Sequence, residues 1–128
     1  VFFRNANVLH MGDNFFRDGY PYIDLASGGD LDGVIAAQER ALALIDDATI
    51  IIPGHGPLSQ KADLAATIAM LRDVRARVQK LVDRGLDEKA VMKAKPLADL
   101  DAKGGASGIN GEDMTRTAYQ SQAKKRAQ

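Results

Sequence analysis

Residues 50–57 read Ile-Ile-Ile-Pro-Gly-His-Gly-Pro, and this stretch decides how the 128-residue sequence is interpreted. Thr49 and the three isoleucines form a short, β-branched, continuously apolar run, which is typical of a strand buried on both faces of a sheet. The prolines and glycines that follow predict an abrupt end to that strand. They leave His55 on a stiff loop whose glycines allow a close approach of the backbone. Metal ligation requires accurate placement of the ligand, and such a loop suits it.

A second candidate residue, Asp13, stands at the end of another predicted strand. Residues 1–3 and 7–11 predict two short strands, and the turn-like residues between them predict a β-hairpin. Gly-Asp then breaks the second strand and places the Asp13 carboxylate at its C-terminal edge. Side chains alternate along a strand, so His10 should point away from Asp13. We therefore expect His10 to be packed or hydrogen-bonded within the strand rather than to be a ligand.

Helical spacing of apolar residues accounts for most of the remaining chain. Asp30, Asp87 and Asn110 are suited to cap helix N-termini, and Gly85 occupies a C-cap position. The predicted helices cover residues 31–45, 63–84, 88–95 and 112–122. The element order predicts an α/β fold in layers, with few strands packed by about four helices, in a single domain over residues 1–128. Two or three strands make a marginal sheet, which suggests that part of the sheet is supplied elsewhere.

Composition and charge narrow the classes of partner. Lys and Arg together number 17, as do Asp and Glu, so there is no electrostatic reason to expect nucleic acid or an anionic membrane. No apolar run approaches the ~18 residues that cross a bilayer. The absence of cysteine excludes disulfides and thiolate metal sites. A net charge of zero lowers the barrier to self-association. The expected partner is a second copy of the chain in a homodimer, or a missing N-terminal half, because either would cover exposed apolar surface. The sequence leaves the cellular compartment open.

The two strand ends together resemble the metallo-β-lactamase superfamily, in which one strand ends in Gly-Asp and a later strand is followed by Gly-His-Gly. Three stretches look like one branch of metal-dependent zinc hydrolases: residues 9–13, 28–35 and 95–101. The resemblance covers nearly the whole chain and implies part of an αββα fold. It also implies that Asp13 bridges two zinc ions and that His55 is a ligand of the second.

The family signature His-x-His-x-Asp-His is missing, because His10 and His55 are the only histidines. A catalytic zinc normally has three protein ligands and a water, whereas only Asp13 and His55 carry over. We therefore expect the C-terminal half of such a hydrolase, truncated and with little or no activity alone. The alternative is a non-catalytic α/β scaffold that self-associates, in which the two residues are vestigial turn or cap residues.

Residues 15–29 predict an irregular loop that is rich in aromatic side chains. Two interpretations of these rings stay open at this point. They line a substrate pocket beside the metal positions, or they cover the apolar face of the hairpin. The residues concerned are Phe15, Phe16, Tyr20 and Tyr22.

Overall fold

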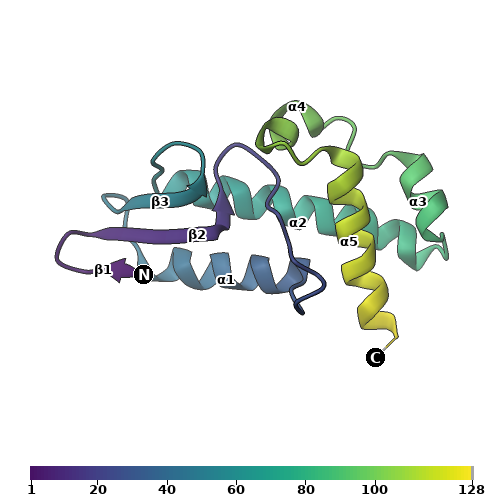
Figure 1. The fold of residues 1–128 in the computed structure, drawn as a ribbon, viewed down its shortest axis with the longest axis horizontal. Helices are drawn as coiled ribbons and strands as arrows, with labels where there is room; N and C mark the ends of the chain where they lie inside the picture. The colour runs from purple at the N-terminus through teal and green to yellow at the C-terminus, as the bar shows by residue number, and fades with distance from the viewer. Residues whose placement is uncertain (128) are drawn as a thin grey trace.

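The computed structural model describes residues 1–127 and shows a mixed α/β fold, which confirms the predicted class (Figure 1). Its three strands are β1 (Phe2–Phe3), β2 (Val8–Phe16) and β3 (Ile50–His55), in the order β1-β2-β3. The hairpin of β1 and β2 is antiparallel, as predicted, whereas β3 runs parallel to β2. The C-terminal ends of β2 and β3 therefore meet at one edge of the sheet.

Helices make up most of the rest of the chain. They are α1 (Leu31–Leu44), α2 (Lys61–Asp83), α3 (Glu88–Ala94), the one-turn α4 (Asp101–Gly104) and α5 (Gly111–Arg126), with a 3-10 turn at Gly105–Ser107. The side chains of Asp30, Asp87 and Asn110 each accept a hydrogen bond from the backbone N–H three residues on, which confirms the three predicted caps. Within residues 1–127, no helix has the length and apolar character needed to cross a bilayer.

Helix α2 joins two clusters of buried side chains. Leu64 and Ile68, near its start, pack beneath the sheet against a cluster that includes Leu9, Phe15 and Ile51. The later turns of α2 enter a larger cluster that is formed with α1, α3 and α5; its buried members on α2 are Leu71, Val74, Val78 and Val82. This single helix therefore fixes the position of the sheet relative to the helical part of the fold.

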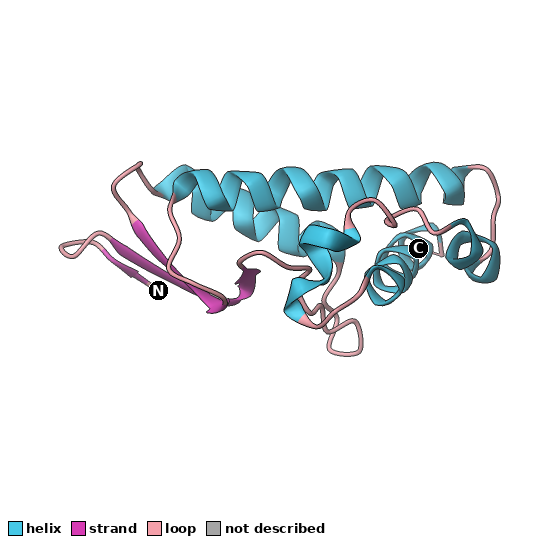
Figure 2. Cartoon of the chain, turned by 90° about the horizontal axis from the view of Figure 1, so that it is seen from above, coloured by secondary structure: helices cyan, strands magenta, loops and turns pink. Residues whose placement is uncertain are grey.

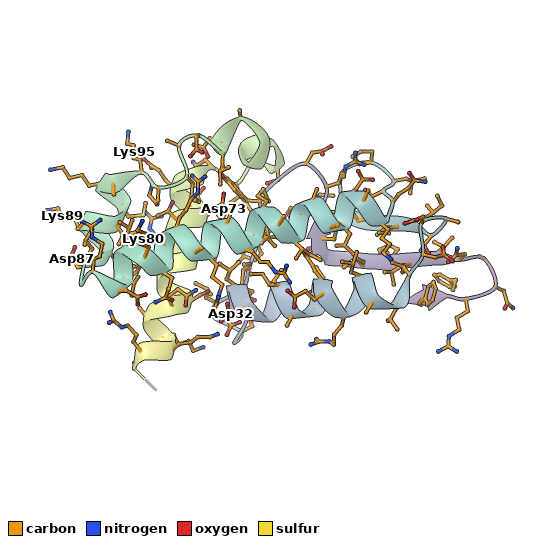
Figure 3. All side chains as sticks on the ribbon, turned by 180° about the vertical axis from the view of Figure 1, so that it is seen from behind. Asp32, Asp73, Lys80, Asp87, Lys89 and Lys95 are labelled. Carbon is orange, nitrogen blue, oxygen red and sulfur yellow. The ribbon has the colours of Figure 1, made fainter. Side chains whose placement is uncertain are left out.

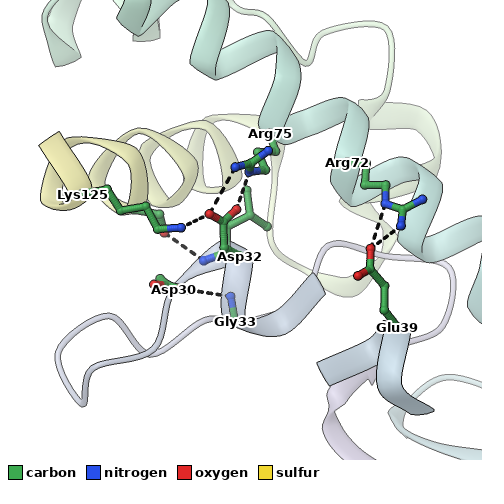
Figure 4. Close-up of polar contacts among 9 residues, drawn as sticks. Asp30, Asp32, Gly33, Glu39, Arg72, Arg75 and Lys125 are labelled. Carbon is green, nitrogen blue, oxygen red and sulfur yellow. Dashed lines mark hydrogen bonds and ion pairs between the residues drawn. The ribbon is translucent and has the colours of Figure 1, made fainter. Parts of the chain in front are cut away.

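Surface ion pairs connect the same helices. Asp32 on α1 pairs with Arg75 on α2 and with Lys125 on α5, and Glu39 on α1 pairs with Arg72 on α2 (Figure 4). Exposed pairs of this kind contribute about 0–1 kcal/mol each. Apolar burial therefore supplies most of the stability, and the ion pairs favour one register of α1 against α2.

Only one face of the sheet is covered by helices (Figure 2). Leu9 and Ile51 are neighbours in β2 and β3, point into the core, and keep 6% and 0% of their surface exposed. Phe3 and Ile50 point to the opposite face and keep 53% and 36% exposed. The prediction that the isoleucine run is buried on both faces is therefore wrong for this chain, because nothing in its described part covers the second face.

Both long strands continue beyond their predicted ends. Gly12 does not end β2; its φ of +54° lies in the left-handed region, and the pairing register shifts on both sides of it. Such irregularities bend a strand and re-aim its side chains while the strand goes on, here as far as Phe16. β3 likewise runs through Pro53, which pairs with Gly12, and ends at His55.

Candidate functional site

Asp13 and His55 lie side by side at the edge where β2 and β3 end. Their Oδ1 and Nε2 atoms are 3.4 Å apart, and the side chains are 69% and 61% exposed. Asp13 follows the bulge in β2, and His55 is the last residue of β3. Because parallel strands end at the same edge of a sheet, the fold presents one carboxylate and one imidazole together to solvent.

Gly54 permits this close approach of the two strands. A Cβ at this position would lie 2.6 Å from the carbonyl carbon of Gly12 and 2.7 Å from its oxygen, and would also meet Oδ1 of Asp13. Real Cβ atoms essentially never come within 3.0 Å of another heavy atom in this way. The absent side chain of Gly54 is thus a condition for the contact between Asp13 and His55.

Two residues at the end of β2, Phe16 and Arg17, also hold the imidazole of His55 in position. The ring of Phe16 lies against the ring of His55, with centroids 4.3 Å apart and planes inclined by 44°. The backbone N–H of the next residue, Arg17, donates to the carbonyl oxygen of His55 over 2.9 Å. The position of the imidazole is therefore set by contacts at both its ring and its backbone.

Arg17 holds the loop that follows His55. Its guanidinium donates to the Leu58 carbonyl oxygen and to Ser59 Oγ, each over 3.2 Å, and pairs with Asp63 of α2 at 3.3 Å. Nothing in the sequence singles out Arg17, because an arginine after a strand looks like any solvated surface charge. Its role depends on a loop about forty positions away, which no local pattern reveals.

His10 takes no part in the pair. Its Nδ1 accepts a hydrogen bond of 3.1 Å from the backbone N–H of Gly12, which requires that nitrogen to be unprotonated. Its neighbour across the sheet is Ile52 of β3. His10 is thus a hydrogen-bonded strand residue that supports the bulge, as the alternation of side chains predicts.

The four aromatic candidates do not form a common pocket wall. Phe15 and Tyr20 are fully buried, Phe16 is 5% exposed beneath His55, and Tyr22 is 63% exposed. Phe15 and Tyr20 also belong to different core clusters. The four rings therefore do not share one wall. Phe15 covers the apolar face of the hairpin, as the other interpretation has it, whereas Tyr20 packs among the helices.

The phenol of Tyr20 has no acid–base role in this arrangement. Burial, together with the nearby carboxylates of Asp101 and Asp99, raises its pKa to about 12, so it stays neutral at ordinary pH. Asp99 is itself held by Arg77 through bonds of 2.5 and 3.1 Å, which keep the pKa of that carboxyl below its usual range. This group of charges stabilises the segment before α4.

The donor set of Asp13 and His55 fits part of a zinc site. Two ligands held at about 2.1 Å from a tetrahedral zinc lie about 3.4 Å apart, which is the separation of these two atoms. A direct charge-assisted hydrogen bond is shorter, about 2.7–2.9 Å. Within residues 1–127, however, no group of three or more His, Asp and Glu side chains is placed to hold a metal. The pair would supply at most two of the three protein ligands that a catalytic zinc normally takes.

Comparison with protein-family models and with curated protein sequences finds no match to this chain.

Proposed function

We propose that this chain is the C-terminal half of a metallo-β-lactamase-like hydrolase whose other metal ligands lie outside this sequence. The 3.4 Å approach of Asp13 Oδ1, beside the bulge in β2, to His55 Nε2, at the end of the parallel strand β3, is the observation that carries the proposal. In a complete protein of this kind, bound zinc supplies a hydroxide at neutral pH and polarises an ester, amide or lactone carbonyl. The role of this chain is to hold the Asp13 carboxylate and the His55 imidazole at a fixed separation.

The rigid surroundings of the pair support this role. Metal ligands need to be held within a few tenths of an ångström by their neighbours. The ring of Phe16, the backbone N–H of Arg17 and the absent side chain of Gly54 together restrict where the imidazole and carboxylate lie.

The uncovered face of the sheet supports a partner polypeptide. Phe3 and Ile50 expose apolar surface there, and the other edge of β3 forms only an isolated bridge, from Ile51 to Ser59. Exposed apolar patches mark surfaces that meet a partner. We infer that the missing half of the hydrolase covers this face, and that a second copy of the chain covers it in a homodimer when that half is absent. The alternative, a non-catalytic scaffold, uses the same face but leaves the geometry of Asp13 and His55 without a purpose.

Zinc titration of the purified chain by calorimetry tests the proposed ligands. We expect one weak zinc site, and the affinity should fall at least tenfold, or ~1.4 kcal/mol, in His55→Gln and in Asp13→Asn. Asp13→Asn removes the negative charge of the carboxylate, and His55→Gln replaces the coordinating imidazole nitrogen by a weakly binding amide. His10→Asn is the matched control, because His10 is the only other histidine and the Oδ1 of asparagine can still accept from the Gly12 N–H. This variant should bind zinc within twofold of the parent chain.

The same titration can contradict the proposal. Equal loss of zinc binding in His10→Asn and His55→Gln would show adventitious binding to surface histidines. Because only two protein ligands are present, we also expect no measurable zinc-dependent ester hydrolysis by the chain alone. Rapid zinc-dependent turnover that disappears in Asp13→Ala would show that the chain is a complete enzyme, against the proposed half.

A further inference from the structure

The two oxygen atoms of the Asp63 carboxylate are bound to two different parts of the fold. Oδ2 accepts a hydrogen bond of 2.8 Å from the backbone N–H of Gln60, which satisfies a donor at the start of α2. Oδ1 pairs with the guanidinium of Arg17 at 3.3 Å, and the side chains of Arg17 and Asp63 are only 25% and 30% exposed. Asp63 is therefore fixed by its own helix, and it restricts where the Arg17 side chain lies.

Arg17 extends this restraint to the loop that follows His55. Its Nη1 donates to the Leu58 carbonyl oxygen and to Ser59 Oγ, each over 3.2 Å. A guanidinium presents its donors in a rigid planar fork, so the pairing with Asp63 and these two bonds depend on one another. The loop after His55 is thus connected to the start of α2 through a single side chain.

Gly56 brings the same loop directly against Arg17. Its φ of +100° lies in the left-handed region, and a Cβ at this position would come 2.7 Å from Cβ of Arg17 and 2.9 Å from its carbonyl oxygen. The backbone N–H of Arg17 also donates to the carbonyl oxygen of His55 over 2.9 Å. A displacement of Arg17 would therefore move the backbone at both His55 and Gly56.

We propose that Asp63 and Arg17 are positioning residues for the imidazole of His55 and act through the backbone that carries it. Asp63 fixes the guanidinium, and the guanidinium fixes residues 56–59. This loop keeps the imidazole against the ring of Phe16, where the centroids are 4.3 Å apart. Residues that orient a metal ligand in this way affect metal affinity. The assignment rests on the proposed function only for the use of the imidazole as a ligand, because the contacts themselves belong to the metal-free chain.

Histidine-selective ¹³C labelling of the metal-free chain, followed by ¹H–¹³C NMR, measures the position of the imidazole. His10 and His55 are the only histidines, so the spectrum contains two imidazoles, and His55→Gln assigns them. The ring current of Phe16 displaces the His55 ring signals from those of a free imidazole, because the two rings lie together. Spectra recorded at about pH 8.5, where histidine side chains in general are neutral, keep protonation out of the comparison.

Two variants remove the proposed restraint at different points. Asp63→Asn removes the charge that pairs with Arg17 but keeps an oxygen that can accept from the Gln60 N–H. We expect the His55 ring signals to move toward those of a free imidazole, while the His10 signals stay unchanged. Arg17→Met should move the His55 signals further, because it removes all the guanidinium bonds and keeps only an apolar stem. No movement in either variant would overturn the proposal.

Asp73→Asn is the matched control on the same helix. Asp73 lies in the middle of α2 and pairs with Arg77 at 3.0 Å, so this variant also loses a partly exposed pair with an arginine (Figure 3). Its fold should persist, because Arg77 keeps Asp99 as a partner. The His55 signals should stay as in the parent chain. Equal movement in Asp73→Asn and Asp63→Asn would show a general loosening of α2 and would also overturn the proposal.

The double variant shows whether the two residues act along one path. If Asp63 acts through the guanidinium, Asp63→Asn adds nothing once Arg17→Met has removed that group, so the double variant should match Arg17→Met alone. Additive displacements of the His55 signals would show two independent effects and contradict the proposed order.

Zinc titration of Asp63→Asn connects the positioning to ligand function. We expect zinc affinity to fall about two- to fivefold, less than the 10–100-fold that is typical of residues bonded directly to a ligand, because Asp63 acts through Arg17. Unchanged zinc affinity beside displaced His55 signals would overturn the role in ligation. Because the NMR measurement needs no metal, a parent chain that binds no zinc would contradict the proposed function and leave the positioning of His55 standing.

Discussion

Phe15→Ala is expected to lower the free energy of unfolding by about 3–5 kcal/mol. The ring of Phe15 is fully buried beneath the sheet, in the cluster that contains Leu9 and Ile51. Its removal leaves a cavity where β2, β3 and α2 meet. Small domains are stable by only about 5–15 kcal/mol, so the loss is a large part of the total. Urea unfolding followed by circular dichroism measures it directly.

Tyr22→Ala is the matched control for the aromatic segment. Tyr22 is 63% exposed, so truncation of its side chain should change the stability by no more than about 0.5 kcal/mol. A similar, small loss in both variants would contradict a core role for Phe15. It would also make the ring of Phe15 a candidate again for the wall of a substrate pocket.

Gly54→Ala should lower the stability by about 1–3 kcal/mol and move β3 away from the bulge in β2. The added methyl group would overlap the backbone of Gly12 and the carboxylate of Asp13, and a strand pair cannot yield there without losing its register. The unfolding free energy measures the cost. Amide shifts of Gly12 and Asp13 in NMR spectra report the local displacement.

Gly105→Ala provides the comparison. Its φ is −73°, and a Cβ there meets no atom within 4 Å, so we expect little change in stability. If Gly54→Ala were as stable as Gly105→Ala and left the amide of Gly12 unmoved, then β2 and β3 would not approach as closely as the structure indicates.

Local chemistry was enough to predict several elements of the fold. Asp30, Asp87 and Asn110 act as helix caps because an N-cap depends only on the next few residues. The end of β3 could not be predicted in the same way. A proline ends a strand where the neighbouring strand requires the backbone N–H that proline lacks. Pro53 instead pairs with the bulged Gly12, so β3 continues through it.

The residues of the candidate site also differ in whether a local sequence pattern marks them. The sequence singles out Asp13 and His55 because each follows an apolar run in a recognisable Gly-Asp or Gly-His-Gly pattern, and the structure places them side by side although β2 continues past Asp13 to Phe16. Arg17 carries no such pattern. Its partners lie on a loop distant in the chain, so only the folded structure reveals what it contacts.

The exposure of one face of the sheet could not be predicted from the sequence, for a different reason. An isoleucine run indicates apolar surroundings without stating which polypeptide supplies them. Ile51 is buried by this chain, whereas Ile50 on the opposite face is 36% exposed. The pattern in the sequence is consistent with a sheet that becomes fully covered only in the presence of a partner, as proposed above.

Crystals of the chain grown with zinc, and diffraction data collected at the zinc absorption edge, test the proposed pairing of ligands most directly. We expect one anomalous peak about 2.0–2.2 Å from both Asp13 Oδ1 and His55 Nε2. A peak beside His10 alone, or one on His55 with the Asp13 carboxylate turned away, would contradict it.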